Sequence, residues 1–275
     1  MTAAMVIQRA QFREHDQYRP YKELDIIVAG TDTSAAMVVW TMTELIKNSA
    51  VMRKVQDELR NLIRGKNFID EDDLPKLTYL KAVVKETFRF HPAAPLLIVR
   101  EAIQNCSIQG YDILPKSLLL VNVWAIGRDP EIWDNPEKFM PERFLGSSVD
   151  FKGQDFELIP FGAGRRMCPG MLLGIANLEL ALANLLYSFD WELPIGVKKE
   201  DIDTDMIPGI AMHKKNPLCF VAKKFPQVNQ RVFRFLPPAH SVQYSGLLWL
   251  IERPCTLERA RWFDQRKVRR FVQLS

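Results

Sequence analysis

Histidine and cysteine are both scarce in this sequence, with four of each among 275 residues. Four irregularly spaced cysteines in a chain of this length do not form a disulfide framework, so we expect reduced thiols in a cytosol-like compartment. The scarcity of histidine disfavours a cysteine hydrolase, which needs a partner histidine in a recognisable context. With 47% hydrophobic residues, the chain can still bury a sizeable core, as one large domain or two.

Long apolar runs and a general excess of positive charge are also missing. No apolar run reaches 18 residues and no signal peptide opens the chain, so we expect no segment that spans a membrane. Residues 1–225 hold 28 Lys or Arg against 30 Asp or Glu, whereas residues 226–275 hold nine against three. The basic character therefore belongs to the C-terminal tail, and we expect no nucleic-acid partner for the body of the chain.

The most informative stretch is Phe-Gly-Ala-Gly-Arg-Arg-Met-Cys-Pro-Gly at residues 161–170, which we call the cysteine loop. It precedes an apolar run from Met171 to Tyr187 whose only charge is Glu179, a pattern that predicts a nearly fully buried helix. Cys168 then lies at a helix entrance, where free N–H groups and the helix dipole favour a thiolate. Such a cysteine is suited to be a metal ligand or a nucleophile.

Three interpretations of Cys168 compete. A cysteine that is merely buried in the core would not need Gly162, Gly164 and Gly170 or two adjacent arginines. A cysteine hydrolase would need a catalytic histidine, and none of the four histidines stands in a recognisable context. In the third, Cys168 is an axial thiolate to haem iron, the glycines let the backbone approach the porphyrin, and an arginine pairs with a propionate. The pattern Phe-x-x-Gly-x-Arg-x-Cys-x-Gly resembles the haem loop of the cytochrome P450 superfamily, with family positions occupied by Phe161, Gly164, Arg166, Cys168 and Gly170.

Residues 21–48 carry apolar side chains at the spacing of one helix face, interrupted by Gly-Thr-Asp-Thr-Ser at residues 30–34, which we call the polar segment. One interpretation is a break between two shorter helices. The other is functional: the Thr33 hydroxyl bonds the carbonyl of Ala29 and locally opens the helix. The segment resembles the oxygen-activation segment of the same superfamily, which implies that Asp32 and Thr33 form a proton-delivery pair.

A helix predicted at residues 77–90 carries Glu86 and Arg89 three positions apart on one face. An exposed pair of this kind contributes little to stability. Together with Pro-Glu-Arg-Phe at residues 141–144, however, the pair resembles the Glu-x-x-Arg motif of the superfamily and the loop arginine that completes it. The resemblance implies that Glu86, Arg89 and Arg143 form a buried charge network that holds the cysteine loop in place.

Short β-type runs predict small sheets beside a mostly helical body. They occur at residues 96–99, 107–111, 118–123, 189–193, 209–213 and 218–222, and an amphipathic helix is predicted at residues 49–64. Arg100 follows the first run, where the superfamily places a propionate-binding arginine. The turn at residues 207–211 resembles part of the substrate pocket's lining. The expected fold is mainly α with small β-sheets (α+β), the C-terminal part of the cytochrome P450 fold.

The resemblance covers residues 21–224 and is closest to the plant A-type families 71 and 83. We expect a poorly ordered start at residues 1–20 and an extraneous, poorly packed tail at residues 225–275. Members of the superfamily are nearly twice this long, so the N-terminal half, with its membrane anchor, is absent from this sequence. In the family that anchor holds the enzyme at the cytosolic face of the endoplasmic reticulum membrane; without it, this chain is expected to be cytosolic.

The resemblance also implies a function. Family members bind haem b, take electrons from NADPH through NADPH–cytochrome P450 reductase, and use O₂ to oxidise a small lipophilic metabolite. Two alternatives stay open: a family member that rearranges hydroperoxides without O₂, which would not need Asp32 and Thr33, and an inactive truncated product that binds haem weakly or not at all.

Overall fold

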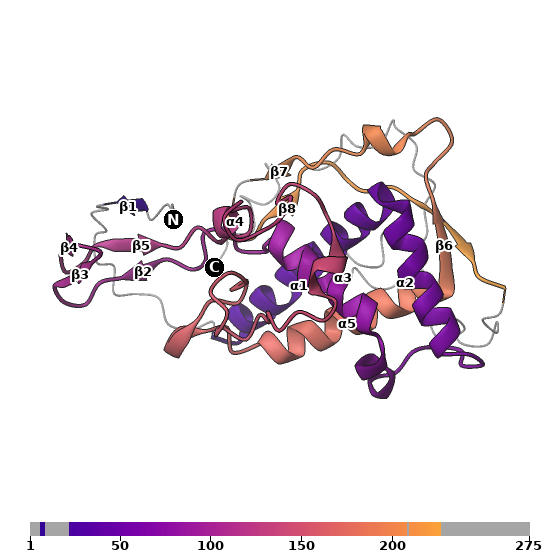
Figure 1. Cartoon of the computed structure of the whole chain (residues 1–275), viewed down its shortest axis with the longest axis horizontal. Helices are drawn as coiled ribbons and strands as arrows, with labels where there is room; N and C mark the ends of the chain where they lie inside the picture. Colours follow the sequence, from indigo (N-terminus) through magenta and orange to yellow (C-terminus); the bar gives the residue numbers. More distant parts are fainter. Residues whose placement is uncertain (1–5, 9–21, 208, 227–275) are drawn as a thin grey trace, which may run out of the picture. The chain divides into compact units, whose positions relative to one another are not determined.

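The computed structural model describes residues 6–8, 22–207 and 209–226. This part of the chain is rich in helix and carries four small antiparallel sheets (Figure 1), which confirms the predicted fold class. Its α-helices are α1 (Lys22–Lys47), α2 (Ser49–Leu62), α3 (Thr78–Phe90), α4 (Val123–Ile126) and α5 (Met171–Ser188). Short 3₁₀ turns join them, namely η1 (Glu71–Lys76), η2 (Pro141–Phe144), η3 (Gly164–Arg166) and η4 (Lys199–Asp201).

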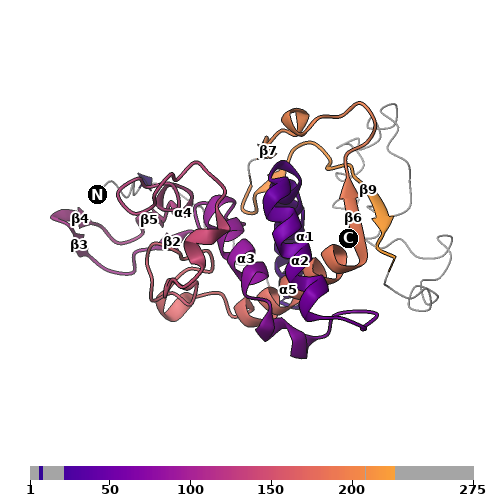
Figure 2. The same cartoon turned by 45° about the vertical axis from the view of Figure 1, so that its right-hand side comes forward.

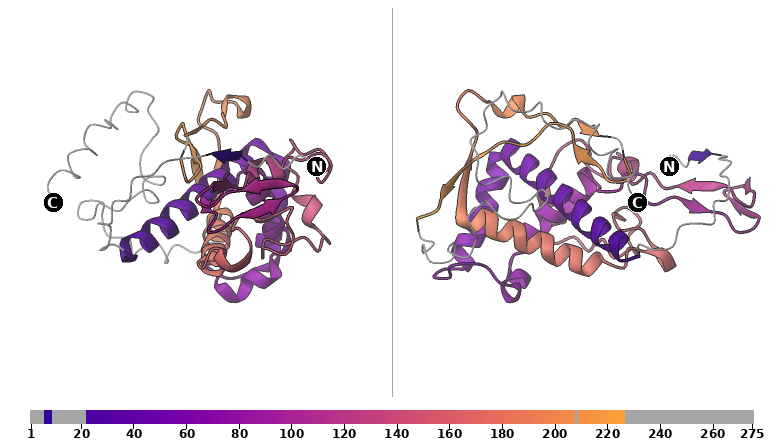
Figure 3. Two further views of the ribbon diagram at one scale, coloured as in Figure 1. Left: turned by 90° about the vertical axis from the view of Figure 1, so that its left-hand side faces the viewer. Right: turned by 180° about the vertical axis from the view of Figure 1, so that it is seen from behind.

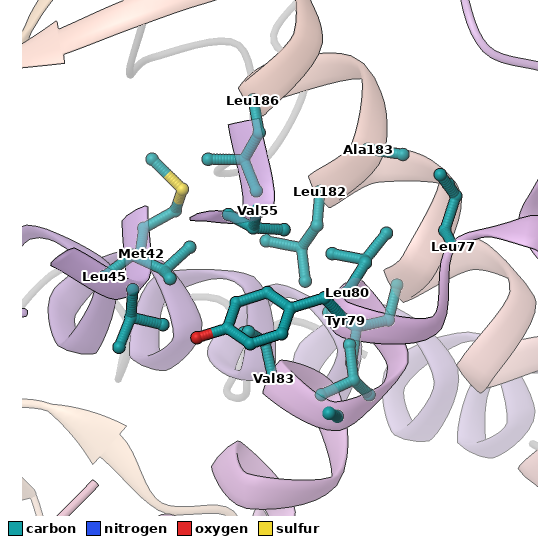
Figure 4. Packing of buried hydrophobic residues seen from close by; sticks show 14 of the residues in the cluster. Met42, Leu45, Val55, Leu77, Tyr79, Leu80, Val83, Leu182, Ala183 and Leu186 are labelled. Atoms are coloured by element: carbon teal, nitrogen blue, oxygen red, sulfur yellow. The ribbon is translucent and has the colours of Figure 1, made fainter. Parts of the chain in front are cut away.

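The core lies where α1, α2, α3 and α5 pack against one another (Figure 2). Leucine and valine side chains from all four helices interdigitate there (Figure 4). Leu45 of α1, Val55 of α2, Leu80 of α3, and Leu182 and Leu186 of α5 have no exposed surface. Fully burying side chains of this size contributes about 1.5–3 kcal/mol each, so this four-helix contact is the main support for the loops that carry polar residues.

The strands pair in four separate antiparallel sheets. One has three strands, in the order β1 (Val6–Gln8), β5 (Leu118–Leu120) and β2 (Arg100–Glu101). The others have two strands each: β3 (Cys106–Ile108) with β4 (Tyr111–Ile113), β6 (Phe189–Glu192) with β9 (Val221–Lys224), and β7 (Met206–Ile207) with β8 (His213–Lys214).

Several predicted strands need correction. No strand forms at residues 96–99, where Leu97 has a φ of +51°, and pairing starts only at Arg100. The run at residues 107–111 is a hairpin turn rather than one strand, because Gln109 and Gly110 both adopt positive φ.

Elsewhere the predicted strands are shorter or displaced. The runs at residues 118–123 and 189–193 form β5 and β6, each shorter than predicted, and only His213 of the run at residues 209–213 is in a strand. The last predicted strand is displaced to β9. Of the predicted poorly ordered start at residues 1–20, the structure describes only β1. The predicted tail at residues 225–275 lies outside the described residues from residue 227 onward.

Two helices, at Ile26–Lys47 and Met171–Ser188, are long and apolar enough to cross a membrane by length and composition alone. Core helices pass the same test, and both of these helices contribute fully buried side chains to the shared core, among them Leu45 and Leu182. Figure 3 shows α1 and α5 running alongside each other, in agreement with their contact. This packing accounts for the buried apolar side chains of both helices.

Candidate functional site

The cysteine loop is a tight turn closed by its own backbone. The amide of Cys168 donates a hydrogen bond to the carbonyl of Phe161 at 2.9 Å. Gly162 and Gly164 have φ values of +75° and +72°, a region that residues with a Cβ rarely adopt. Cys168 is exposed at the end of this turn. The glycines of the pattern are therefore needed for the shape that presents the thiol.

The loop is anchored through its first residue and its backbone. The ring of Phe161 packs edge-on against Phe88 of α3, with 5.0 Å between ring centroids. On another side, a Cβ added to Gly153 would lie 3.2 Å from the carbonyl oxygen of Gly162 and 3.1 Å from the sulfur of Met167. Close packing of this kind holds the loop in one place while its cysteine stays open.

Helix α5 begins three residues after Cys168, so the predicted helix entrance is correct. Its first turn is only partly buried: Met171 lies in the core, whereas Leu172 and Leu173 are 72% and 67% exposed. The prediction of a nearly fully buried helix is therefore wrong for this end. Leu172 and Leu173 leave an open hydrophobic surface at the start of α5, a few residues after Cys168 in the sequence.

Arg100 and the apolar residues before it lie against the cysteine loop. The guanidinium Nη2 of Arg100 donates to the carbonyl oxygen of Arg166 at 2.8 Å. A Cβ on Gly162 would lie 3.9 Å from Leu97 and 4.0 Å from Arg100. Arg166 itself is exposed. Arg100 and Leu97 thus lie against the loop, and Arg166 of the loop adds a second exposed guanidinium.

The structure brings Glu86, Arg89 and Arg143 together. Arg89 donates to both carboxylate oxygens of Glu86, at 2.7 and 2.8 Å, and Arg143 lies 3.1 Å from the same carboxylate. The side chains of Glu86 and Arg89 have no exposed surface, and that of Arg143 is 7% exposed. A buried charge of this kind is stable only when it is paired and hydrogen-bonded.

Backbone carbonyls complete the network. Arg89 also donates to the carbonyl oxygens of Gly127, Pro136 and Lys138, and the amide of Met140 donates to Glu86 at 2.7 Å. The single pair Glu86 and Arg89 therefore organises the segment at residues 127–140 that leads to η2. Sequence reasoning found the charged members but not these carbonyl partners, for which the sequence carries no signal.

The polar segment lies inside a continuous helix. α1 runs without a break from Lys22 to Lys47, so the interpretation of two shorter helices is wrong. The hydroxyls of Thr31, Thr33 and Ser34 each donate to the carbonyl four residues back, at 2.6–2.7 Å. The predicted bond from Thr33 to Ala29 is therefore present, without a change of helix type. Because these hydroxyls form hydrogen bonds within the helix itself, the helix accommodates the polar segment without a break.

Asp32 and Thr33 are exposed and half-buried, respectively, and in the described part of the chain no hydrogen bond joins them to the cysteine loop. The partner of Asp32 is instead His213, whose Nε2 lies 3.0 Å from Oδ2. Sequence reasoning missed this contact because it joins residues 181 positions apart. It also missed a buried pair, His91 and Glu44, joined at 2.8 Å.

Comparison with known proteins decides the family. The family model for cytochrome P450 matches residues 21–220. The chain belongs to the cytochrome P450 family. Among curated relatives, cytochrome P450 71B34 of Arabidopsis thaliana is 55% identical over 202 residues, covering 74% of this chain and 40% of the relative. Desmethyl-deoxy-podophyllotoxin synthase of Sinopodophyllum hexandrum is 54% identical over 198 residues, covering 72% of this chain and 39% of that protein.

Solved structures agree with this family. A zebra fish cytochrome P450 structure with abiraterone matches with a TM-score of 0.66 and 30% identity, covering 74% of this chain and 46% of that one. The chain spans about 40% of the length of the curated relatives it matches. The predicted resemblance to plant family 71 is confirmed, because the relatives are named as members of it.

The residues around Cys168 fit the haem of this family. The thiol is open, Leu172 and Leu173 at the start of α5 leave apolar surface exposed, and Arg100 and Arg166 offer cations for propionates. No cluster of three or more His, Cys, Asp or Glu side chains suited to a metal occurs within residues 22–207 and 209–226.

Proposed function

We propose that this chain is part of a haem-thiolate monooxygenase that oxidises a small lipophilic secondary metabolite with O₂. The observation that carries the proposal is the exposed Cys168, presented by a glycine turn and surrounded by arginines and apolar side chains. The family named by the comparisons uses haem at this loop. Haem b, when bound, supplies the activation of O₂ by thiolate-ligated iron.

Each site residue has a role in this proposal. The Cys168 thiolate holds the iron, Arg166 and Arg100 pair with the propionates, and Phe161 fixes the start of the loop against α3. Gly162, Gly164 and Gly170 keep side chains away from the porphyrin face.

Asp32 and Thr33 move protons. The Thr33 hydroxyl gives its hydrogen to Ala29, so its oxygen retains acceptor capacity towards a water or a substrate. The Asp32 carboxylate exchanges protons with water. This pair favours oxygen chemistry over the rearrangement of hydroperoxides, which does not need proton delivery.

Glu86, Arg89 and Arg143 support the site without touching substrate. They fix α3 and the segment before η2, and α3 in turn carries the Phe88 ring against which the cysteine loop packs. The turn at residues 207–211 contributes to the substrate pocket. We place the intact protein at the cytosolic face of the endoplasmic reticulum membrane, with NADPH–cytochrome P450 reductase as its electron donor.

The test of the proposal is a haem titration of the purified chain, followed by absorbance. We expect uptake of one haem per chain in the wild type and in Cys106→Ser, which removes another exposed thiol. Cys168→Ser is expected to weaken haem binding and change the absorbance spectrum. Equal spectra for Cys168→Ser and the wild type would contradict the assignment of the ligand, and a chain that takes up no haem would mean that these residues are insufficient for activity.

A further inference from the structure

A contact between Asp32 and His213 joins α1 to the paired strands β7 and β8, which we call the C-terminal hairpin. Nε2 of His213 lies 3.0 Å from Oδ2 of Asp32, and the two side chains are 37% and 50% exposed, respectively. α1 contacts β8 along this edge. A carboxylate on an exposed helix turn normally samples several rotamers. A hydrogen-bond partner in a fixed position restricts the carboxylate to fewer of them.

The backbone that carries His213 is fixed immediately before the imidazole. The amide of Met212 donates to the carbonyl of Ala93 at 2.8 Å, and the indole of Trp40 donates to the carbonyl of Met212 at 2.8 Å. Met212 is 2% exposed and packs with Trp40. Trp40 lies on α1, the same helix as Asp32, so one helix holds both ends of the contact.

The residue after His213 is fixed as well. The ammonium of Lys214 lies 3.0 Å from the carboxylate of Asp203, and the Lys214 side chain is 3% exposed. In the β7–β8 pairing, His213 lies opposite Ile207. The backbone that carries the imidazole is therefore held on both sides, which fixes the position from which His213 reaches Asp32.

We propose that His213 is a positioning residue for proton delivery: its Nε2–H holds the Asp32 carboxylate in one orientation beside Thr33. The effect of His213 on proton delivery rests on the proposed function, whereas the contact between His213 and Asp32 does not depend on haem. The physical argument is that a proton donor is effective only when its geometry is fixed. The C-terminal hairpin then belongs to the proton-delivery site, although it is 181 residues from Asp32 in the sequence.

The contact is tested first on the chain without haem. The chain has four histidines, so selective ¹⁵N labelling gives a small set of imidazole signals that report which ring nitrogen carries the proton. We expect His213 as the Nε2–H tautomer, and we expect its signals to shift in Asp32→Ala. Glu44→Gln is the matched control, because it is expected to move the His91 signals and leave those of His213 unchanged.

The functional consequence is tested with two substitutions in the haem-loaded chain with reductase, using 7-ethoxycoumarin as a lipophilic probe. His213→Gln keeps an N–H donor, whereas His213→Phe keeps a ring without one. We expect His213→Phe to lower kcat for NADPH consumption about tenfold, which is less than the roughly 10²–10⁴-fold that a positioned acid contributes, because Asp32 itself is retained. His213→Gln is expected to stay within about twofold of the wild type. KM for the probe is expected to be unchanged in both variants, because the contact acts on proton delivery rather than on substrate binding.

Unchanged His213 signals in Asp32→Ala would overturn the inference, and so would equal rates for His213→Phe and the wild type. A rate for His213→Gln as low as that of His213→Phe would also overturn it, since imidazole titration rather than positioning would then be required. A wild-type chain without haem uptake counts against the proposed function alone, because the imidazole signals still decide whether the contact exists.

Discussion

Arg89 donates two hydrogen bonds to the carboxylate of Glu86, at 2.7 and 2.8 Å, and neither side chain exposes any surface. The pair connects α3 to the segment before η2 through Arg143 and three backbone carbonyls. A buried ion pair adds little net stability, but removing one partner is costly because the other charge is then buried without a counter-charge. The pair is therefore the most sensitive point in the support of the cysteine loop.

Glu86→Gln removes the charge that neutralises the two arginines. We expect the free energy of unfolding to fall by about 3–5 kcal/mol, because buried guanidinium groups are left without a counter-charge. The measurement is urea denaturation followed by far-UV circular dichroism. Glu192→Gln makes the same chemical change in the exposed pair with Lys223 and is expected to cost less than about 1 kcal/mol. Equal losses in the two variants would contradict the burial of the network.

Position 127 requires glycine because a side chain there would collide with the backbone of Arg89, not because the backbone adopts a conformation that favours glycine. A Cβ added there would overlap the backbone carbonyl of Arg89, and Gly127 has an ordinary helical φ of −66°. We expect Gly127→Ala to lower the free energy of unfolding by about 1–3 kcal/mol. Gly174→Ala, inside α5 with nothing near its Cβ position, is expected to raise it by up to about 1 kcal/mol. Thermal unfolding of both variants checks the opposite signs.

His91 makes stability depend on pH. Burial lowers the pKa of His91 below its ordinary value of 6.5. The hydrogen bond that the ring donates to the Glu44 carboxylate opposes this lowering of the pKa, and the positive charges of Arg128 and Lys47 add to it. Its Nδ1 is buried without a hydrogen-bond partner in the described part of the chain, so protonation would place a charged N–H against no acceptor. The imidazole therefore favours the neutral form, stacked 4.2 Å from the ring of Trp40.

The sign follows from the lowered pKa. Below about pH 6.5 the unfolded chain binds a proton at this position that the folded chain does not, so folding stability falls as the pH falls. We expect the free energy of unfolding to decrease between about pH 7 and about pH 5.5, by at most ~1.4 kcal/mol per pH unit for this one group. His91→Leu is expected to reduce that slope. The same slope in both proteins would show that other groups are responsible.

The sequence is most informative where apolar residues recur at the spacing of one helix face. The helices at residues 49–64 and 77–90 were predicted to within two residues of α2 and α3, because their apolar spacing matches the face that packs in the core. Strands were predicted poorly, since each has only two to four residues and is defined by its partner rather than by its own pattern. Leu97 shows this directly, because its positive φ interrupts the run of leucine and β-branched residues at residues 96–99.

The same distinction between local patterns and long-range contacts applies to the candidate site. Local motifs placed Cys168 at a helix entrance and set Glu86 and Arg89 on one helix face, since both depend on spacing within a few residues. Contacts between distant segments were not accessible in this way. His213 reaches Asp32 only because the chain folds back along α1, and the carbonyls that bind Arg89 belong to a loop without a regular pattern.

The most direct test of the central claim, that Cys168 is the axial ligand of haem iron, is the Soret band of the reduced, CO-bound chain. We expect a strongly red-shifted band in the wild type and in Cys106→Ser, because only a thiolate opposite CO produces it. Cys168→His is expected to retain haem and lose the red shift, since a neutral imidazole replaces the thiolate. A red-shifted band that persists in Cys168→His would contradict the account.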